Sequence, residues 1–151
     1  MKYSILLLML SATLGLVKRA KQENPLGNKY WVYSSSTISP ALDINMDGKV
    51  DTDILKAAPK CEIDDAIRLD PEGVLMTHRG KVHCFEDEEV EEEAGTWTYN
   101  PKTKVLVLDF DDSHRASVMT LTEVSSQRIT AVSTHESSMG KHTIRTVLTP
   151  K

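Results

Sequence analysis

The feature that most constrains this 151-residue chain is a series of short apolar segments separated by turn residues. Apolar and polar side chains tend to alternate within the segments, and glycine, proline, asparagine and aspartate stand between them. A spacing of about 8 to 12 residues between such segments indicates an all-β sandwich or barrel. The predicted strands are residues 29–33, 66–69, 74–78, 95–99, 104–110, 117–124, 128–133 and 143–148.

The connections between these strands favour a small up-and-down antiparallel β-barrel of about eight strands. The turns, such as residues 70–73, are short and join consecutive strands. A meander that closes on itself has no exposed edge, and eight strands enclose packed side chains or one small ligand. The positions expected to face inward include Val105, Val107, Met119 and Leu121.

Residues 43–54 have the spacing of a calcium-binding loop. Oxygen-bearing side chains recur at alternate positions from Asp43, and Gly48 stands at the sixth position, where the chain must reverse sharply. Ca²⁺ takes about six to eight oxygen ligands, which alternating side chains in a tight turn supply. The predicted ligands of a structural Ca²⁺ ion are Asp43, Asn45, Asp47, Lys49 through its backbone carbonyl, Asp51 and Asp53.

The loop differs from an EF-hand in two respects. Ile54 stands at the twelfth position, where a bidentate glutamate would close the site, and no amphipathic helix precedes Asp43. Residues 52–58 favour a short helix that ends before Pro59. The pattern is therefore nearer to a loop followed by one helix, as in calcium sites of secreted proteins. An acidic turn that binds no metal is the alternative.

The N-terminal residues have the pattern of a secretory signal peptide. Lys2 precedes an apolar run over residues 5–17, which is short for a membrane span of about 20 residues. We expect a signal peptide at 1–20, a linker at 21–26 and one β-barrel domain at 27–151. The protein is then exported to the periplasm, the outer cell surface or the medium. It associates with a membrane only if the N-terminal segment remains uncleaved.

Cys61 and Cys84 are the two cysteines of the chain, and an even number behind an export signal predicts a disulfide. The bond would connect the segment after the calcium loop with the start of an acidic run at residues 86–93. Two free buried thiols are the alternative. We expect the acidic run itself to be a solvated loop, because a block of like charges repels itself.

The charge and the motifs of the chain restrict its function. A net charge of −4 argues against a nucleic-acid partner, because phosphate binding needs a basic face. The sequence contains no G-x-S-x-G elbow, no P-loop and no G-x-G-x-x-G, so no enzyme motif is present. Trp31 and Trp97 either line a barrel mouth, where they stack on a ligand, or fill the core.

Segments spread over residues 27 to 149 together carry a family resemblance. They are Gly27-Asn28-Lys29-Tyr30-Trp31, the loop and helix from Asp43 to Leu55, Cys61, Leu69-Asp70-Pro71-Glu72-Gly73, Cys84, and Gly95-Thr96-Trp97-Thr98-Tyr99 before the strand at 104–108. In this combination the chain resembles the lipocalin-like domain proteins of Bacteroidetes-type bacteria. The resemblance implies a small exported or lipid-anchored barrel with a ligand cavity and no enzymatic activity. The lipobox cysteine of many such proteins is missing here.

We therefore expect an exported, non-enzymatic, lipocalin-like binding protein with a structural calcium loop. Its ligand would be a small apolar molecule or a lipid held inside the barrel. The alternative is a structural or protein-interaction module of the cell envelope, with a filled barrel and an envelope protein as its partner.

Overall fold

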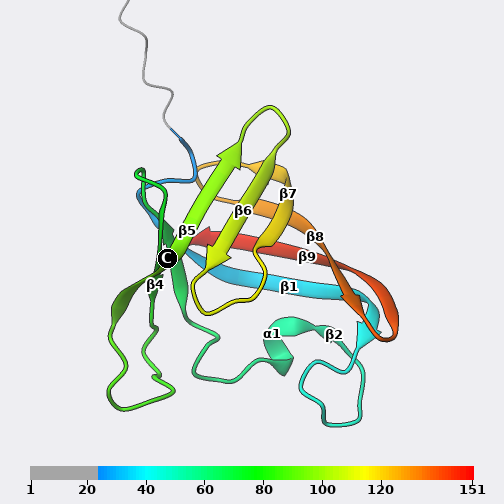
Figure 1. The fold of residues 1–151 in the computed structure, drawn as a ribbon. Helices are drawn as coiled ribbons and strands as arrows, with labels where there is room; N and C mark the ends of the chain where they lie inside the picture. Colours follow the sequence, from blue (N-terminus) through cyan, green and yellow to red (C-terminus); the bar gives the residue numbers. More distant parts are fainter. Residues whose placement is uncertain (1–23) are drawn as a thin grey trace, which may run out of the picture.

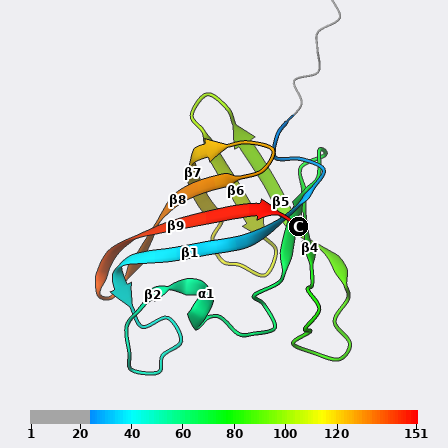
Figure 2. The same ribbon diagram turned by 180° about the vertical axis from the view of Figure 1, so that it is seen from behind.

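The computed structural model describes residues 24–151, so the predicted signal peptide and the first half of the predicted linker, residues 21–23, lie outside the described residues. Eight antiparallel strands close into one barrel (Figures 1 and 2). The strands follow one another in chain order, and the barrel closes because β1 (Tyr30–Leu42) pairs with β9 (Gly140–Pro150). The prediction of an all-β, up-and-down antiparallel barrel of about eight strands is confirmed.

The remaining elements agree closely with the predicted segments. They are β2 (Asp51–Asp53), α1 (Ile54–Ala57), β3 (Ala66–Leu69), β4 (Val74–His78), β5 (Glu91–Asn100), β6 (Val105–Phe110), β7 (Ser117–Val124) and β8 (Ile129–Ser137). The bounds of β3, β4 and β7 equal the predicted ones. β2 is a short additional strand that pairs with β1. The helix α1 is shorter than predicted, and Asp53 caps it by accepting a hydrogen bond from the backbone amide of Lys56 at 3.3 Å.

One strand begins earlier than the sequence predicts. β5 starts at Glu91, so the last three residues of the acidic run lie in a strand paired with β4 and not in a solvated loop. Two of these charges have partners. Glu91 accepts a hydrogen bond from the Tyr30 hydroxyl at 2.7 Å and contacts Arg68 at 3.3 Å, and together they hold its pKa below the usual value. Glu92 contacts Arg79 at 2.7 Å.

The interior face of β6 is also different from the predicted one. Leu106 and Leu108 are at most 1% exposed and point into the core, whereas Val105 and Val107 are only half-buried. All four positions are apolar, so alternation along this strand does not distinguish its two faces. The prediction that the two valines face inward is therefore wrong.

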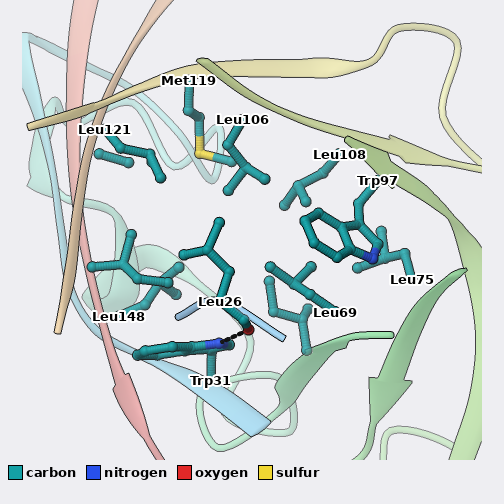
Figure 3. Close-up of a cluster of buried hydrophobic side chains, with 13 residues drawn as sticks. Leu26, Trp31, Leu69, Leu75, Trp97, Leu106, Leu108, Met119, Leu121 and Leu148 are labelled. Atoms are coloured by element: carbon teal, nitrogen blue, oxygen red, sulfur yellow. Dashed lines mark hydrogen bonds between the residues drawn. The ribbon is translucent and has the colours of Figure 1, made fainter. Parts of the chain in front are cut away.

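The hydrophobic core, shown in close-up in Figure 3, lies at the end of the barrel where β1 begins and β9 ends. The segment before β1 inserts Leu26 among side chains of the strands, and the Trp31 indole N–H donates to the Leu26 carbonyl at 2.8 Å. Leu26 is fully buried, so the folded domain begins before residue 27 and the predicted linker boundary is wrong there. The buried core residues are Leu26, Trp31, Ile67, Leu69, Leu75, Trp97, Leu106, Leu108, Met119, Leu121, Ile129, Ala131 and Leu148.

The end of the barrel opposite Leu26 carries α1, β2 and several long connections. Figure 1 shows α1 and β2 below β1, on the same side as the loop after β4 and the loop between β6 and β7. The short turn between β5 and β6 lies at the other end, as both views show. Among residues 24–151, no helix has the length and apolar character needed to cross a membrane.

Candidate functional site

The barrel opens on its side because β7 and β8 separate. Pairing between them extends from Thr120 to Val124 of β7, and residues 117–119 have no described partner on β8. β8 continues to Ser137 along β9, while the first part of β7 pairs with β6 (Figure 1). The two strands therefore expose part of the interior at the end that the core does not fill.

A cavity of about 780 Å³ lies at this opening. Its apolar wall includes Ile54, Leu108, Phe110, Met119 and Ile144, which come from α1, β6, β7 and β9. Serine and threonine hydroxyls from β1, β8 and β9 add polar contacts. The volume lies within the range of about 300 to 1,000 Å³ that is typical of small-molecule sites. The charged or titratable side chains that line it are Tyr33, Arg115, His135, Glu136 and Lys141.

A second cavity of about 450 Å³ lies between β3, β4 and β5 and the start of the loop after β6. Ala66, Ile67, Thr77 and Ala94 form much of its uncharged wall. Its charged lining differs from that of the larger cavity, because carboxylates predominate. These charged residues are Asp65, Arg79, Glu92, Glu93, Asp111 and Asp112.

Tyr33 and Phe110 line both cavities, so the two spaces meet at these rings. Both rings pack on the edge of the core and remain partly accessible. Burial raises the pKa of the Tyr33 hydroxyl. Tyr33 and Phe110 therefore form a wall that the two cavities share.

Arg79 connects three segments at the edge of the smaller cavity. Its guanidinium contacts Glu92 at 2.7 Å, Asp65 at 3.0 Å and Glu88 at 3.4 Å. Burial lowers the pKa of Arg79, but the hydrogen bond to Asp65 and the charges of Glu88 and Glu92 outweigh this effect and raise it. The charge of Arg79 is therefore already balanced within the protein.

The predicted disulfide between Cys61 and Cys84 is present, with 5.2 Å between the two Cα atoms. The two segments that it joins are also linked by hydrogen bonds from backbone amides. Gly80 donates to Asp65 at 2.9 Å, and Lys81 donates to Asp64 at 2.7 Å. The disulfide therefore reinforces a contact between the segment after α1 and the loop after β4.

The two tryptophans do not line the opening. Trp31 is fully buried and Trp97 is 7% exposed, and both belong to the core. Their indole N–H groups donate to the carbonyls of Leu26 and Asp70, each at 2.8 Å. The prediction that they stack on a ligand is therefore wrong, and the alternative that they fill the core is confirmed. A buried indole needs a partner for its N–H, which these carbonyls provide.

The first half of the predicted calcium loop is folded around its own oxygen atoms. The Asp43 carboxylate accepts hydrogen bonds from the amides of Asp47 at 3.1 Å and Gly48 at 2.9 Å, and Asn45 accepts from the Asp47 amide at 3.2 Å. Gly48 has φ +85°, a conformation that favours glycine. The carboxylate and amide oxygens of Asp43, Asn45 and Asp47 are thus close together and chemically suited to Ca²⁺.

The second half of the loop is arranged less favourably. Asp51 accepts a long hydrogen bond of 3.4 Å from the Ile44 amide, which places it near the start of the loop. Asp53 caps α1 and contacts Lys56 at 3.3 Å, so its carboxylate is directed to the helix. Lys49 donates its amide to Asp47 at 2.9 Å. Within the described chain, no three His, Cys, Asp or Glu side chains gather as metal ligands, and the calcium site stays a prediction.

Sequence reasoning missed the residues that border the cavities. Tyr33 and Phe110 stand at the last positions of predicted strands, where nothing in the local pattern distinguishes an interior ring from a surface ring. Arg79 follows a predicted strand and resembles any surface arginine. The one signal available in the sequence was the acidic pair Asp111 and Asp112 directly after Phe110, but which strands this pair lies beside depends on strand register.

Comparison with known proteins adds no family assignment. No family model matches this sequence, and no curated protein shows significant similarity to it. The functional argument therefore depends on the geometry of the barrel interior.

Proposed function

We propose that this protein is an exported, non-enzymatic binding protein that carries a small molecule with an apolar body. The observation that supports this proposal most strongly is the 780 Å³ cavity at the place where β7 and β8 separate. Its lining combines apolar side chains with hydroxyl groups and with Arg115, His135, Glu136 and Lys141, and small-molecule sites commonly join an apolar wall to a few polar groups. The disulfide supports export, because such bonds persist mainly in oxidising compartments.

A second candidate is an interaction module that binds another envelope protein. This candidate is favoured by exposed apolar side chains on the loop after β4, where Val82 is 54% and Phe85 is 69% exposed. The same loop is held in place by the disulfide and by Arg79. The carrier function is preferred, because an interaction module requires no cavity inside the barrel.

The carrier proposal is tested with N-phenylnaphthylamine, a neutral apolar fluorophore. We expect saturable binding of one molecule, and the Ser133→Phe variant should weaken it by about tenfold, which corresponds to about 1.4 kcal/mol, because the added ring occupies the larger cavity. The matched control is Lys102→Phe, which adds the same ring on the exposed turn between β5 and β6. Absence of saturable binding, or equal affinity in both variants, would contradict the proposal.

We also propose that Asp43, Asn45 and Asp47 hold a structural Ca²⁺ ion together with Asp51, the Lys49 carbonyl and Asp53. A bound ion would balance the carboxylates of the loop and fix the chain between β1 and β2. Asp53 would have to turn away from Lys56 to join the others.

Replacing Asp47 with alanine is the corresponding test. A ligand at 100 times its Kd stabilises a protein by about 2.7 kcal/mol, so wild type should gain several degrees in Tm when calcium replaces chelator. Asp47→Ala should lose most of this gain, because one ligand is removed. The control Asp87→Ala removes an exposed carboxylate outside the loop and should respond as wild type does. An equal response of all three proteins in differential scanning calorimetry would refute the calcium site.

A further inference from the structure

Two buried hydroxyl groups face each other on the wall of the larger cavity. Ser36 of β1 is opposite Thr146 of β9, and their hydroxyl oxygens are 3.1 Å apart in a hydrogen bond. The two residues are only 6% and 7% exposed, and both line the cavity. The next pair on the same face of these strands, Ile38 and Ile144, is apolar. The Ser36–Thr146 pair is therefore a polar patch in an apolar part of the wall.

The Ser36–Thr146 pair cannot satisfy both of its hydrogen atoms. Each hydroxyl carries one donor hydrogen, and the bond between them uses one of the two. Within residues 24–151, neither hydroxyl forms a hydrogen bond with any other residue, so the second hydrogen has no acceptor there. Leaving a buried donor without an acceptor is costly in free energy. Because both residues line the cavity, a ligand is the group that can supply the missing acceptor.

The Tyr33 hydroxyl is a second donor on the same wall. Tyr33 precedes Ser36 on β1, and the shift in register between β1 and β9 lies between them, so that Tyr33 is opposite the buried residue Leu148. Burial raises the pKa of the Tyr33 hydroxyl, which therefore keeps its proton. In the described part of the chain this hydroxyl has no hydrogen-bond partner. The cavity wall thus presents more hydrogen-bond donors than the surrounding protein pairs.

The charged side chains of the larger cavity are not placed to balance a charge at this patch. Arg115, Glu136 and Lys141 are exposed, and Glu136 is opposite Lys141 in the pairing of β8 with β9. A charged group of a ligand placed against the buried Ser36–Thr146 pair would lose its hydration without gaining an opposite charge. The patch is therefore suited to a neutral acceptor.

We infer that the ligand is a neutral molecule with an apolar body and a carbonyl oxygen, such as a ketone or an ester, and that the Ser36–Thr146 pair donates a hydrogen bond to this oxygen. A carbonyl oxygen has two lone pairs and no hydrogen, so it supplies an acceptor without adding a donor. The apolar body lies against the wall formed by Leu108, Met119 and Ile144. This inference rests on the proposed carrier function and specifies the class of ligand.

The test compares butyrophenone with butylbenzene, which has a methylene group in place of the carbonyl. Each competes with N-phenylnaphthylamine for the full chain, and the loss of fluorescence measures its affinity. The variant Ser36→Ala/Thr146→Val removes both hydroxyls and nearly keeps the side-chain shapes, a change that is often close to neutral for stability. It should weaken butyrophenone by about fivefold, as expected for one lost hydrogen bond, and leave butylbenzene unchanged. Unchanged butylbenzene binding shows that the cavity survives the substitutions.

The matched control is Thr143→Val, which makes the same change on β9 at an exposed position outside both cavities and should affect neither compound. Phenylbutanoate, a charged analogue, should bind wild type more weakly than butyrophenone does. The carbonyl inference is overturned, and the carrier function stands, if butyrophenone does not compete, if the double variant leaves its affinity unchanged or weakens both compounds equally, or if phenylbutanoate binds more tightly. Wild type that binds neither N-phenylnaphthylamine nor any competitor would overturn both.

Discussion

Replacing Trp31 with alanine is expected to lower the free energy of unfolding by about 3 to 5 kcal/mol, the usual range for removal of a large buried aromatic side chain. Trp31 is fully buried, and it is the side chain that contacts the Leu26 carbonyl. Its loss would leave a cavity at the closed end of the barrel and a carbonyl without its donor. Urea unfolding followed by far-ultraviolet circular dichroism measures the effect without depending on tryptophan fluorescence.

Trp31→Phe is the matched control for this prediction. It keeps an aromatic ring in the core but removes the indole N–H, so its loss of stability should be clearly smaller than that of the alanine variant. A loss below about 1 kcal/mol for Trp31→Ala, the size of an ordinary surface change, would show that Trp31 does not stabilise the core as described.

Removing the disulfide is expected to have the second largest effect. The bond joins residues 23 apart in sequence, and in the chain-entropy model a loop of this size contributes about 3 kcal/mol. The variant Cys61→Ser/Cys84→Ser should therefore unfold at lower urea concentration than the oxidised protein. Hydrogen exchange should increase most in the loop after β4, because Arg79 and the barrel strands keep their own contacts.

The double variant also serves as the control for a second experiment, in which the disulfide is reduced chemically. A phosphine reductant should destabilise wild type to about the level of Cys61→Ser/Cys84→Ser and should leave that variant unchanged. The disulfide account is contradicted if alkylation finds two free thiols in the unreduced protein, or if the double variant is as stable as oxidised wild type.

Much of the barrel could be predicted because its strands are short, alternating and separated by turn residues. In the hairpin of β3 and β4, both strands begin and end at the residues that the sequence predicts. Prediction failed where side-chain chemistry depends on distant partners. Glu91 lies in a strand where the Tyr30 hydroxyl donates a hydrogen bond to it and Arg68 forms an ion pair with it, and no local pattern contains that information. Leu26 falls in the predicted linker because a single leucine before a strand does not indicate burial.

The candidate site was less accessible to sequence reasoning than the fold. The larger cavity exists because β7 and β8 stop pairing before Thr120, and this register is a property of the whole barrel. The sequence did indicate two tryptophans as ring-bearing candidates, but the rings on the cavity walls belong to Tyr33 and Phe110. The spacing of the calcium loop was visible because its residues are adjacent in the chain, and only the direction of Asp53 required coordinates.

Native mass spectrometry of the protein, purified from the cells that make it, tests the central claim most directly. The claim is that the cavity where β7 and β8 separate carries a small molecule. The expected result is a folded species heavier than the oxidised chain by one organic molecule, with the extra mass lost on denaturation. A folded species with the mass of the bare chain, or of the chain plus metal alone, together with no saturable binding of N-phenylnaphthylamine, would contradict the account.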